Sequence, residues 1–195
     1  MTRFLDVVFS LIGIVLLSPV FLLVAIWIRL NSKGPVFYRQ QRIGRYGEAF
    51  SLYKFRSMRL DADRGSLLTF SDTDARITSP GRFIRKYKID ELPQLLNVLA
   101  GKMSIVGPRP EVKKYVDLYT EEQRNVLNVR PGITDIASIT YYNENKILES
   151  QKDPEEYYIH HIMPHKIRLN KLYIDNPSTA NYFRIIFLTI KKALS

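Results

Sequence analysis

An uncharged apolar run near the N-terminus restricts the fold of this chain more than any other feature of its sequence. No charged residue occurs between Val7 and Ile28. A helix of about 20 residues crosses the ~30 Å hydrocarbon core of a bilayer, so the run is long enough to form a membrane segment. Because no small-residue cleavage pattern follows it, we expect residues 1–30 to be a retained membrane helix rather than a cleaved signal.

Two details leave the path of this helix open. Ser18-Pro19 lies in the middle of the run, where the proline removes one backbone hydrogen bond and bends the helix. Arg3 precedes the run, and Arg29 and Lys33 follow it; basic residues of this kind mark the cytoplasmic side of a membrane. Two cytoplasmic ends predict a re-entrant helix in one leaflet, whereas a proline-kinked helix that spans the bilayer is the commoner object.

The charge and composition of the chain restrict its partners. Its 195 residues suffice for one compact catalytic unit, which we place at residues 31–195, and they carry a formal net charge of +10. Such a charge predicts an anionic partner: nucleic acid, an acidic membrane surface or phosphorylated substrates. The uncharged run argues against nucleic acid. The absence of cysteine excludes disulfides, thiolate metal sites and cysteine nucleophiles.

Periodicity and turn residues predict an α/β (α+β) fold in which helices dominate. Gly44 and Gly47 mark the turn of a β-hairpin over residues 36–58, and loop-forming residues are frequent from 60 to 80. Leucines at i, i+3, i+4 and i+7 predict a helix over residues 92–99, which Gly101 ends. Further helices are predicted over residues 111–126, 155–173 and 180–194.

The last of these predicted helices is amphipathic. Arg184, Lys191 and Lys192 lie opposite an apolar stripe of Tyr182, Phe183, Ile186, Phe187 and Ile190. A helix of this kind can lie on a membrane surface, although packing against its own domain is the more common arrangement.

Two adjacent acids, Asp90 and Glu91, precede the predicted 92–99 helix. The partial positive charge at a helix N-terminus favours the ionised form of both, which suits a nucleophilic or metal-binding carboxylate. Aspartate is also a preferred N-cap and glutamate is common in a first turn. The local sequence alone therefore favours a structural role for the pair.

Several cations in the sequence can gather around this acid pair. Arg85 and Lys88 precede it, Arg109 follows the helix, and Lys54 and Arg56 end the predicted hairpin. Arginine binds phosphate oxygens in a bidentate manner. Acids and arginines gathered in this way suggest phosphoryl transfer, with an anion or a metal bound between them. Simple surface ion pairs remain an alternative for each of these motifs.

Four sequence blocks together resemble one protein family. The chain is similar to the bacterial sugar transferases, the monotopic polyprenol phosphate phosphoglycosyl transferases. The blocks are Lys54-Phe55-Arg56-Ser57-Met58, Asp90-Glu91-Leu92-Pro93-Gln94-Leu95, Met103-Ser104-Ile105-Val106-Gly107-Pro108-Arg109-Pro110 and Arg130-Pro131-Gly132-Ile133-Thr134. They occur in the order and spacing of the family, and the resemblance runs from the membrane segment to about Thr134.

The resemblance favours the re-entrant form of the membrane segment. In this family the N-terminal helix breaks at a Ser-Pro, which corresponds to Ser18-Pro19. The resemblance also implies several interfacial amphipathic helices. It places the catalytic domain at the cytoplasmic face of the bacterial inner membrane, in contact with membrane lipids.

The resemblance further implies a double-displacement mechanism. Asp90 attacks the sugar-linked phosphate of a UDP-sugar, UMP leaves, and undecaprenyl phosphate then takes the sugar phosphate. Glu91 helps to bind Mg²⁺ with Asp90 and assists deprotonation of the acceptor. The cationic residues that match phosphate-binding or acid-holding positions are Lys54, Arg56, Arg85 and Arg109, with Arg130 as a nucleotide contact. The reaction is the first membrane step in the assembly of an exopolysaccharide, O-antigen or capsule. Whether the protein forms a homodimer is left open.

The C-terminal third departs from the commoner family pattern. Asp135-Ile136-Ala137-Ser138 follows the fourth block, and Tyr141-Tyr142-Asn143-Glu144-Asn145 comes next, where many members have Gly and a Gln-containing stretch. We expect this region to affect sugar specificity more than the type of reaction.

Three histidines, His160, His161 and His165, lie further along. His161 and His165 have i, i+4 spacing, but Pro164 lies between them and no metalloprotease glutamate accompanies them, so we predict no metal site there.

Overall fold

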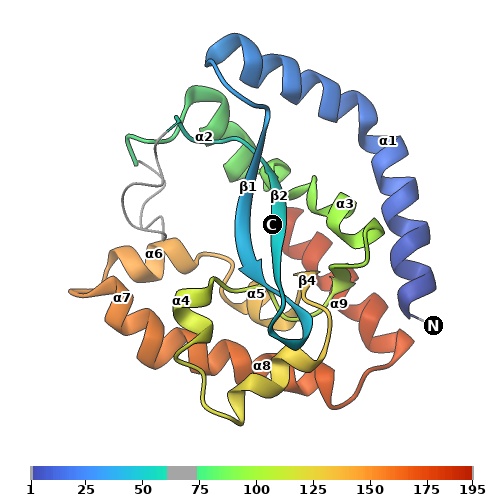
Figure 1. Ribbon diagram of the computed structural model, residues 1–195, viewed down its shortest axis with the longest axis vertical. Helices are drawn as coiled ribbons and strands as arrows, with labels where there is room; N and C mark the ends of the chain where they lie inside the picture. Colours follow the sequence, from blue (N-terminus) through green and yellow to red (C-terminus); the bar gives the residue numbers. More distant parts are fainter. Residues whose placement is uncertain (1, 61–73, 195) are drawn as a thin grey trace.

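The computed structural model describes residues 2–60 and 74–194, and helices dominate it. Helix α1 (Thr2–Asn31) runs along one side of the molecule, and a long hairpin crosses its centre (Figure 1). Helix α2 (Ser79–Lys86) lies beside the upper end of the hairpin, α3 (Gln94–Leu99) lies between the hairpin and α1, and the helices from α4 (Lys113–Val116) to α8 (Met163–Ile174) gather around its lower part (Figure 1). This arrangement agrees with the predicted helix-dominated fold with a small sheet.

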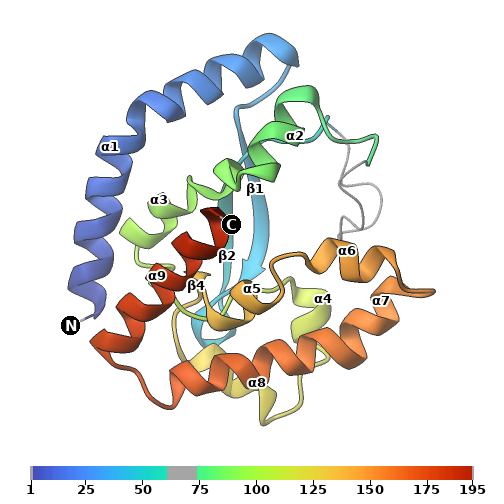
Figure 2. The same cartoon turned by 180° about the vertical axis from the view of Figure 1, so that it is seen from behind.

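Helix α1 is long and apolar enough to cross a membrane, by length and composition alone. Pro19 lies inside it, and both ribbon views show that the helix changes direction partway along its length (Figures 1 and 2). Residues 18 and 19 are both helical, so the proline is accommodated within a bent helix. Much of the apolar surface of α1 is exposed, and the exposed fraction is 71% for Leu16, 67% for Leu23 and 82% for Leu30.

The first turns of α1 are tied to the rest of the domain by polar contacts. The Arg3 guanidinium donates hydrogen bonds to the carbonyl oxygens of Val98 (2.7 Å) and Leu99 (3.2 Å). The buried carboxylate of Asp6 accepts hydrogen bonds from the Tyr182 hydroxyl (2.9 Å) and the Ile105 amide (2.9 Å). A charged group buried in a membrane-type helix thus finds its partners in the folded domain.

The last turns of α1 are held by apolar packing. Val24 and Ile28 form a buried cluster with Phe55 and Ile84. The Phe21 ring contacts the Phe55 ring edge to face, with the ring centroids 5.4 Å apart. Both ends of α1 therefore contact one and the same domain.

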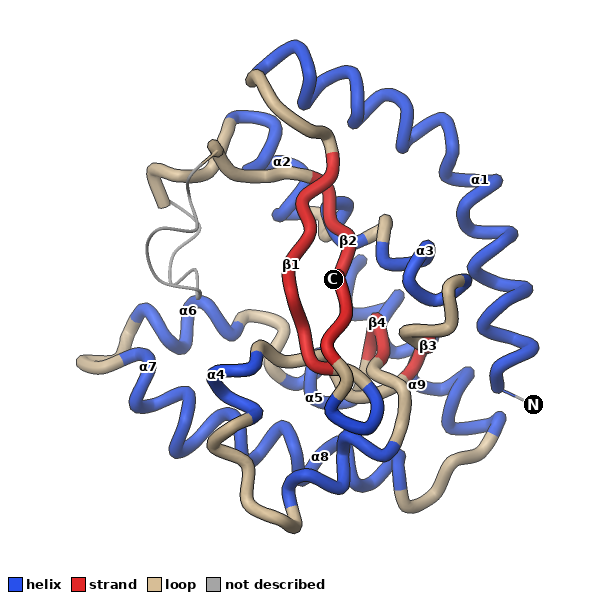
Figure 3. The backbone as a smooth tube through the Cα atoms, in the orientation of Figure 1, coloured by secondary structure: helices blue, strands red, loops and turns tan. Residues whose placement is uncertain are grey.

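The predicted β-hairpin is confirmed. Strands β1 (Phe37–Ile43) and β2 (Ala49–Phe55) pair antiparallel, with Phe37 opposite Phe55 and Ile43 opposite Ala49 (Figure 3). Gly47 has a φ of 78° in the turn between them, a conformation that glycine adopts without strain. The hairpin brings the end of β2 against the last turns of α1, where Phe55 packs with Val24 and Ile28.

A second, smaller sheet was not predicted. Strands β3 (Ser104–Val106) and β4 (Gly132–Thr134) pair in parallel. The backbones of Gly107 and Gly132 approach so closely that a Cβ atom on Gly132 would overlap Gly107. The glycines of the third and fourth sequence blocks, Gly107 and Gly132, thus allow the two backbones to lie in close contact.

Helix α2 (Ser79–Lys86) was also absent from the prediction, which assigned residues 60–80 to a loop. The part of that loop at residues 61–73 lies outside the described residues. The Thr78 hydroxyl caps α2 by accepting a hydrogen bond from the Gly81 amide (3.1 Å), and Pro80 lies in its first turn. Helix α3 (Gln94–Leu99) confirms the predicted 92–99 helix, and Gly101 follows it with a φ of 80°.

The prediction of a single helix over residues 111–126 is wrong. The chain forms a short α4 (Lys113–Val116) and a separate 3-10 helix, η4 (Gln123–Asn128). Thr120 and Gln123 explain the interruption, because each side chain binds the backbone amide of the other residue, at 3.3 and 3.0 Å, and starts a new helical turn. Two short helices that were not predicted, α5 (Ile136–Thr140) and α6 (Glu144–Glu149), follow.

The two C-terminal helices are confirmed in outline. Residues 155–173 are covered by α7 (Pro154–Tyr157), a π-helical turn η5 (Tyr158–Ile162) and α8 (Met163–Ile174), and α9 spans Thr179–Leu194. The π-helical turn ends two residues before Pro164, which has no amide hydrogen to donate. Figure 2 shows α9 on the back of the molecule, where it contacts β3, β4 and α5.

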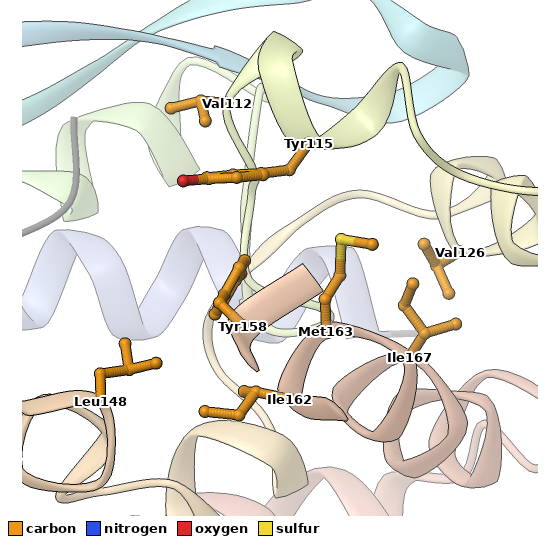
Figure 4. Packing of buried hydrophobic residues seen from close by; sticks show 8 residues of the cluster. All are labelled: Val112, Tyr115, Val126, Leu148, Tyr158, Ile162, Met163 and Ile167. Atoms are coloured by element: carbon orange, nitrogen blue, oxygen red, sulfur yellow. The ribbon is translucent and has the colours of Figure 1, made fainter. Parts of the chain in front are cut away.

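The largest apolar cluster lies beneath these C-terminal helices. Its buried members extend from α4 to α8 (Figure 4), and they are Val112, Tyr115, Val126, Leu148, Tyr158, Ile162, Met163 and Ile167. Separate clusters lie under the hairpin and against α1, so the core is divided around the centre of the molecule.

We predict that Tyr182→Phe destabilises the protein, because it removes one donor from the buried Asp6 carboxylate. The expected cost is about 1–3 kcal/mol, seen as a lower midpoint of thermal unfolding in detergent. Tyr173→Phe is the matched control, since Tyr173 packs in the same cluster and its hydroxyl has no hydrogen bond to the described residues. Equal midpoints for the two variants would contradict the anchoring role of Asp6.

Candidate functional site

The acid pair lies on a 3-10 turn, η3 (Ile89–Glu91), between α2 and α3. Asp90 is only 6% exposed, and its Oδ1 atom has no hydrogen-bond partner among the described residues. Because a buried carboxylate oxygen without a partner is costly, its presence marks a candidate reactive or ligand-binding atom. The pair precedes α3 by one turn instead of starting that helix.

Glu91, by contrast, is fully engaged. Its Oε1 atom accepts hydrogen bonds from the Lys54 ammonium (2.9 Å) and from the Arg109 guanidinium, and its Oε2 atom accepts a second one from Arg109 (3.0 Å). Lys54 comes from β2 and Arg109 from the segment after β3, so three distant parts of the sequence meet here. Three of the predicted site residues thus form one ion cluster, Glu91–Lys54–Arg109.

The two acids have opposite protonation behaviour. Burial raises the pKa of Asp90, and the adjacent Glu91 charge adds to this effect. Burial would also raise the pKa of Glu91, but Arg109 and Lys54 outweigh it and hold that pKa well below its usual range. Glu91 is therefore a fixed anion, whereas Asp90 is the more basic carboxylate of the two.

The pKa values of the two cations in the cluster shift in opposite directions. Burial lowers the pKa of Lys54, and the nearby Arg109 charge contributes, although Glu91 opposes both. The Glu91 carboxylate raises the pKa of Arg109 further above its usual value. Arg109 therefore keeps a full positive charge beside the acid pair.

Arg85 and Lys88 lie close enough to Asp90 to act on it electrostatically. Both of their charges oppose the rise in the pKa of Asp90 that burial causes. Arg85 lies in the last turn of α2, and Lys88 is the residue from which η3 begins. This arrangement is consistent with the prediction that Arg85 lies near Asp90.

Asp135 organises the site without having been predicted to do so. Its Oδ2 atom accepts a hydrogen bond from the Arg109 amide (2.7 Å), and its Oδ1 atom caps α5 at the Ser138 amide. The buried Asp135 carboxylate thereby fixes the backbone from which the Arg109 side chain extends. The pattern Asp-x-x-Ser, an N-cap signal directly after the fourth block, was the available clue.

Two predicted site residues make their contacts elsewhere. The buried Arg56 guanidinium donates to the carbonyl oxygens of Ser32 (2.8 Å) and Lys33 (2.7 Å). It satisfies carbonyl groups just past the end of α1, where no helical partner exists, instead of facing the acid pair. The Arg130 Nε atom donates to the Gly101 carbonyl (3.0 Å). The binding of substrate phosphate by Arg56 and of nucleotide by Arg130 therefore stays a prediction, beside these backbone contacts.

The histidines make contacts of other kinds. His160 lies 3.2 Å from the Glu156 carboxylate, and His161 stacks on the Tyr157 ring. His165 is hydrogen bonded to the Tyr141 hydroxyl at 2.6 Å. A surface hollow beside His160 and His161 includes neither acid of the pair nor any of the cations near it.

The residues present fit Mg²⁺ in part. The unpartnered Oδ1 of Asp90 is the kind of hard oxygen that Mg²⁺ prefers, whereas both oxygens of Glu91 already accept hydrogen bonds. Within the described residues no group of three or more His, Cys, Asp or Glu side chains forms a metal cage. Mg²⁺ is commonly held by one or two carboxylates together with substrate phosphates, which this geometry allows.

Comparison with known proteins identifies the family. The family model described as bacterial sugar transferase matches residues 1–195. The chain is 39% identical to the uncharacterized sugar transferase EpsL of Bacillus subtilis, over 98% of this chain and 86% of that protein. It is 35% identical to a UDP-glucose:undecaprenyl-phosphate glucose-1-phosphate transferase of Klebsiella pneumoniae, over 97% of this chain.

A third relative is the UDP-N-acetylgalactosamine-undecaprenyl-phosphate N-acetylgalactosaminephosphotransferase of Aeromonas hydrophila. It is 42% identical over 71% of this chain. The chain spans 39% of the Klebsiella protein and 34% of the Aeromonas protein. With a family match along its whole length and these relatives, the chain belongs to the bacterial sugar transferase family.

Proposed function

We propose that this chain transfers a sugar 1-phosphate from a UDP-sugar to undecaprenyl phosphate and releases UMP. The activities for which the Klebsiella and Aeromonas relatives are named support these substrates. The observation that carries the chemistry is the unpartnered, buried Oδ1 of Asp90 beside a cluster of cations. The reaction would be the first membrane step in the assembly of a cell-surface glycan.

Two displacements at phosphorus account for the overall reaction. In the first, an Asp90 oxygen attacks the phosphorus attached to the sugar, and the bond from that phosphorus to the UMP oxygen breaks. In the second, a phosphate oxygen of undecaprenyl phosphate attacks the same phosphorus. The bond to Asp90 then breaks, which restores the carboxylate and leaves the sugar on a lipid diphosphate.

Electrostatics explains how a carboxylate can attack an anionic diphosphate. Lys54 and Arg109 place positive charge where the transferring phosphoryl group would lie, and the buried setting strengthens their effect. Glu91 orients both cations through its hydrogen bonds. Because its pKa is held low, we assign Glu91 to this positioning role and not to deprotonation of the acceptor.

Mg²⁺ is part of the proposal. Asp90 would hold it through its unpartnered oxygen together with substrate phosphates, and Glu91 would join only by giving up a hydrogen bond to Lys54 or Arg109. When bound, Mg²⁺ neutralises charge on the phosphate groups.

We also propose that α1 enters one leaflet and returns. Arg3 and Asp6 at its start and Ile28 near its end all contact the same domain, which supports an arrangement with both ends on one side. The basic residues Arg29 and Lys33 near its end favour the cytoplasmic side for that end. The acceptor phosphate, anchored in the bilayer by its polyprenol chain, would then meet the acid pair at the headgroup level.

The topology can be tested with cysteines, because the natural chain has none. Thr2→Cys and Lys33→Cys, made separately, should both react with a membrane-impermeant maleimide in inside-out vesicles and be protected in intact spheroplasts. A cysteine in the hairpin turn, Tyr46→Cys, serves as the marker of the catalytic side. Opposite labelling of positions 2 and 33 would establish a spanning helix and contradict the proposal.

Asp90→Asn tests the nucleophile. The substitution keeps the side-chain shape but removes the attacking charge, so UMP release from a panel of UDP-sugars should fall at least about a thousandfold. Without the acceptor, mass spectrometry should find a sugar-phosphate adduct on the Asp90 peptide of the wild type only. Because burial raises the pKa of Asp90, replacing its charge with a neutral amide should leave the unfolding midpoint equal or higher at pH 7.

Undiminished turnover in Asp90→Asn would contradict the assignment of the nucleophile. A wild type that turns over none of the UDP-sugars, although folded in membranes, would contradict the proposed function as a whole.

The pH dependence follows from the raised pKa of Asp90. The attacking form is the ionised one, so kcat/KM should fall as the pH decreases through a pKa that lies above the ordinary aspartate value of 3.8. The fixed negative charge of Glu91 contributes to that rise, and Glu91→Gln should therefore move this acid limb to lower pH. A limb at or below 3.8 in the wild type would be inconsistent with the buried nucleophile. The measurement is initial UMP release from pH 4 to 8 with saturating acceptor, on protein shown to be folded at each pH.

A further inference from the structure

Lys88 has a strained backbone directly beside the acid pair. Its φ of 56° lies in the left-handed region, which only Lys88 and Tyr46 share among the described non-glycine residues. This conformation costs about 1–2 kcal/mol for an ordinary L-residue, and a glycine would avoid most of that cost. The Lys88 side chain makes no capping hydrogen bond that would offset the strain. A strained residue two positions before a proposed nucleophile suggests a functional reason for its side chain.

The Lys88 ammonium is held by an aromatic ring rather than by an acid. Its Nζ atom lies 5.6 Å from the centroid of the Tyr142 ring, within the range of a cation–π contact. None of the carboxylates in the described part of the chain pairs with it. A ring attracts the ammonium without neutralising its charge, so the charge stays available to an anion.

Tyr142 lies at the edge of the site. The Lys192 ammonium of α9 approaches the same ring at 5.7 Å, so two ammonium groups meet at one aromatic side chain. Glu144, two residues further on, is close enough to raise the pKa of Arg109. The segment that carries Tyr142 therefore contacts Lys88 and lies near enough to Arg109 to act on its charge, and it belongs to the part of the chain that departs from the commoner family pattern.

The charges around the acid pair do not balance. Four cations, Lys54, Arg85, Lys88 and Arg109, act on two carboxylates, Asp90 and Glu91. The other acids near Arg109 are occupied, because Glu144 pairs with Lys166 at 2.8 Å and Asp135 accepts backbone hydrogen bonds. Backbone hydrogen bonds leave the negative charge of Asp135 in place near Arg109, so the excess is one positive charge, which suits a phosphate anion.

We propose that Lys88 is a phosphate-binding residue of this site and that Tyr142 is the positioning residue that holds it there. The inference rests on the proposed function for the identity of the phosphate. The shared chemistry is a phosphate group, which can come from the UDP-sugar or from the lipid acceptor.

Two pairs of variants separate this role from a structural one. Lys88→Gln and Lys86→Gln each remove one positive charge from the same stretch of chain, and the Lys86 ammonium contacts the Tyr87 ring, outside the site. We expect kcat/KM to fall about 10- to 100-fold in Lys88→Gln and to stay within about twofold in Lys86→Gln. Lys88→Gly should lose the same activity but unfold at an equal or higher temperature, because the strain is relieved.

The positioning role of Tyr142 is tested by substitutions that keep or remove its aromatic ring. Tyr142→Phe keeps the aromatic face and should keep activity, whereas Tyr142→Leu should lose activity about three- to tenfold, in line with the strength of a cation–π contact. In the Lys88→Gln background, Tyr142→Leu should have little further effect. An unchanged Tyr142→Leu single variant would overturn the positioning role.

Separate measurements identify which phosphate Lys88 binds. A rise in KM for the UDP-sugar with an unchanged KM for undecaprenyl phosphate assigns the donor, and the reverse assigns the acceptor. The shift of the unfolding midpoint by UMP or by undecaprenyl phosphate gives a readout that requires no turnover. A shift in the wild type and Lys86→Gln that is reduced in Lys88→Gln supports the inference even if the wild type turns over no UDP-sugar. Equal shifts and equal kinetics in the two Gln variants would overturn it.

Discussion

The ion cluster of Glu91 with Lys54 and Arg109 is the interaction on which the site depends. It joins the end of the hairpin, the η3 turn and the segment after β3, which are far apart in the sequence. Partly buried ions of this kind contribute little net stability, because desolvation offsets their attraction. Their effect is to fix geometry: with Glu91 saturated, the neighbouring Asp90 is left as the one acid of the pair with an unpartnered oxygen. Adjacent carboxylates thereby acquire different roles from different surroundings.

The supporting structure around this cluster is polar and unusually dependent on glycine. Arg109 is placed by the close approach of β3 and β4, which the backbones of Gly107 and Gly132 permit, and by the Asp135 carboxylate on its amide. Asp135 in turn caps α5, so the start of that helix and the position of Arg109 depend on a single side chain. A substitution at Gly107, Gly132 or Asp135 should therefore displace Arg109 before it causes the domain to unfold.

The sequence predicted the hairpin, α3 and the C-terminal helices because periodicity and turn residues encode them locally. It also placed Lys54, Glu91 and Arg109 in one site, through the family resemblance. The backbone contacts of Arg56 were not predicted, because a cation in a phosphate-binding motif can equally satisfy the carbonyl groups past a helix end, and only the fold shows that it does so. Pairing of β3 with β4 could not be predicted, since two three-residue strands have no periodicity. Helix α2, by contrast, had a readable Thr78 cap with Pro80 after it.

The way in which α1 is held connects these local features to the membrane. A helix of this hydropathy would be free to span a bilayer if only its last turns contacted the domain. Asp6 opposes that freedom, because pulling the start of α1 away from the domain would leave its carboxylate without the Tyr182, Ser104 and Ile105 donors. A buried carboxylate stripped of its hydrogen bonds costs several kcal/mol in an apolar medium, more than most single apolar contacts can offset. The polar start of the helix, and not only its proline, therefore favours a path that returns to the same face.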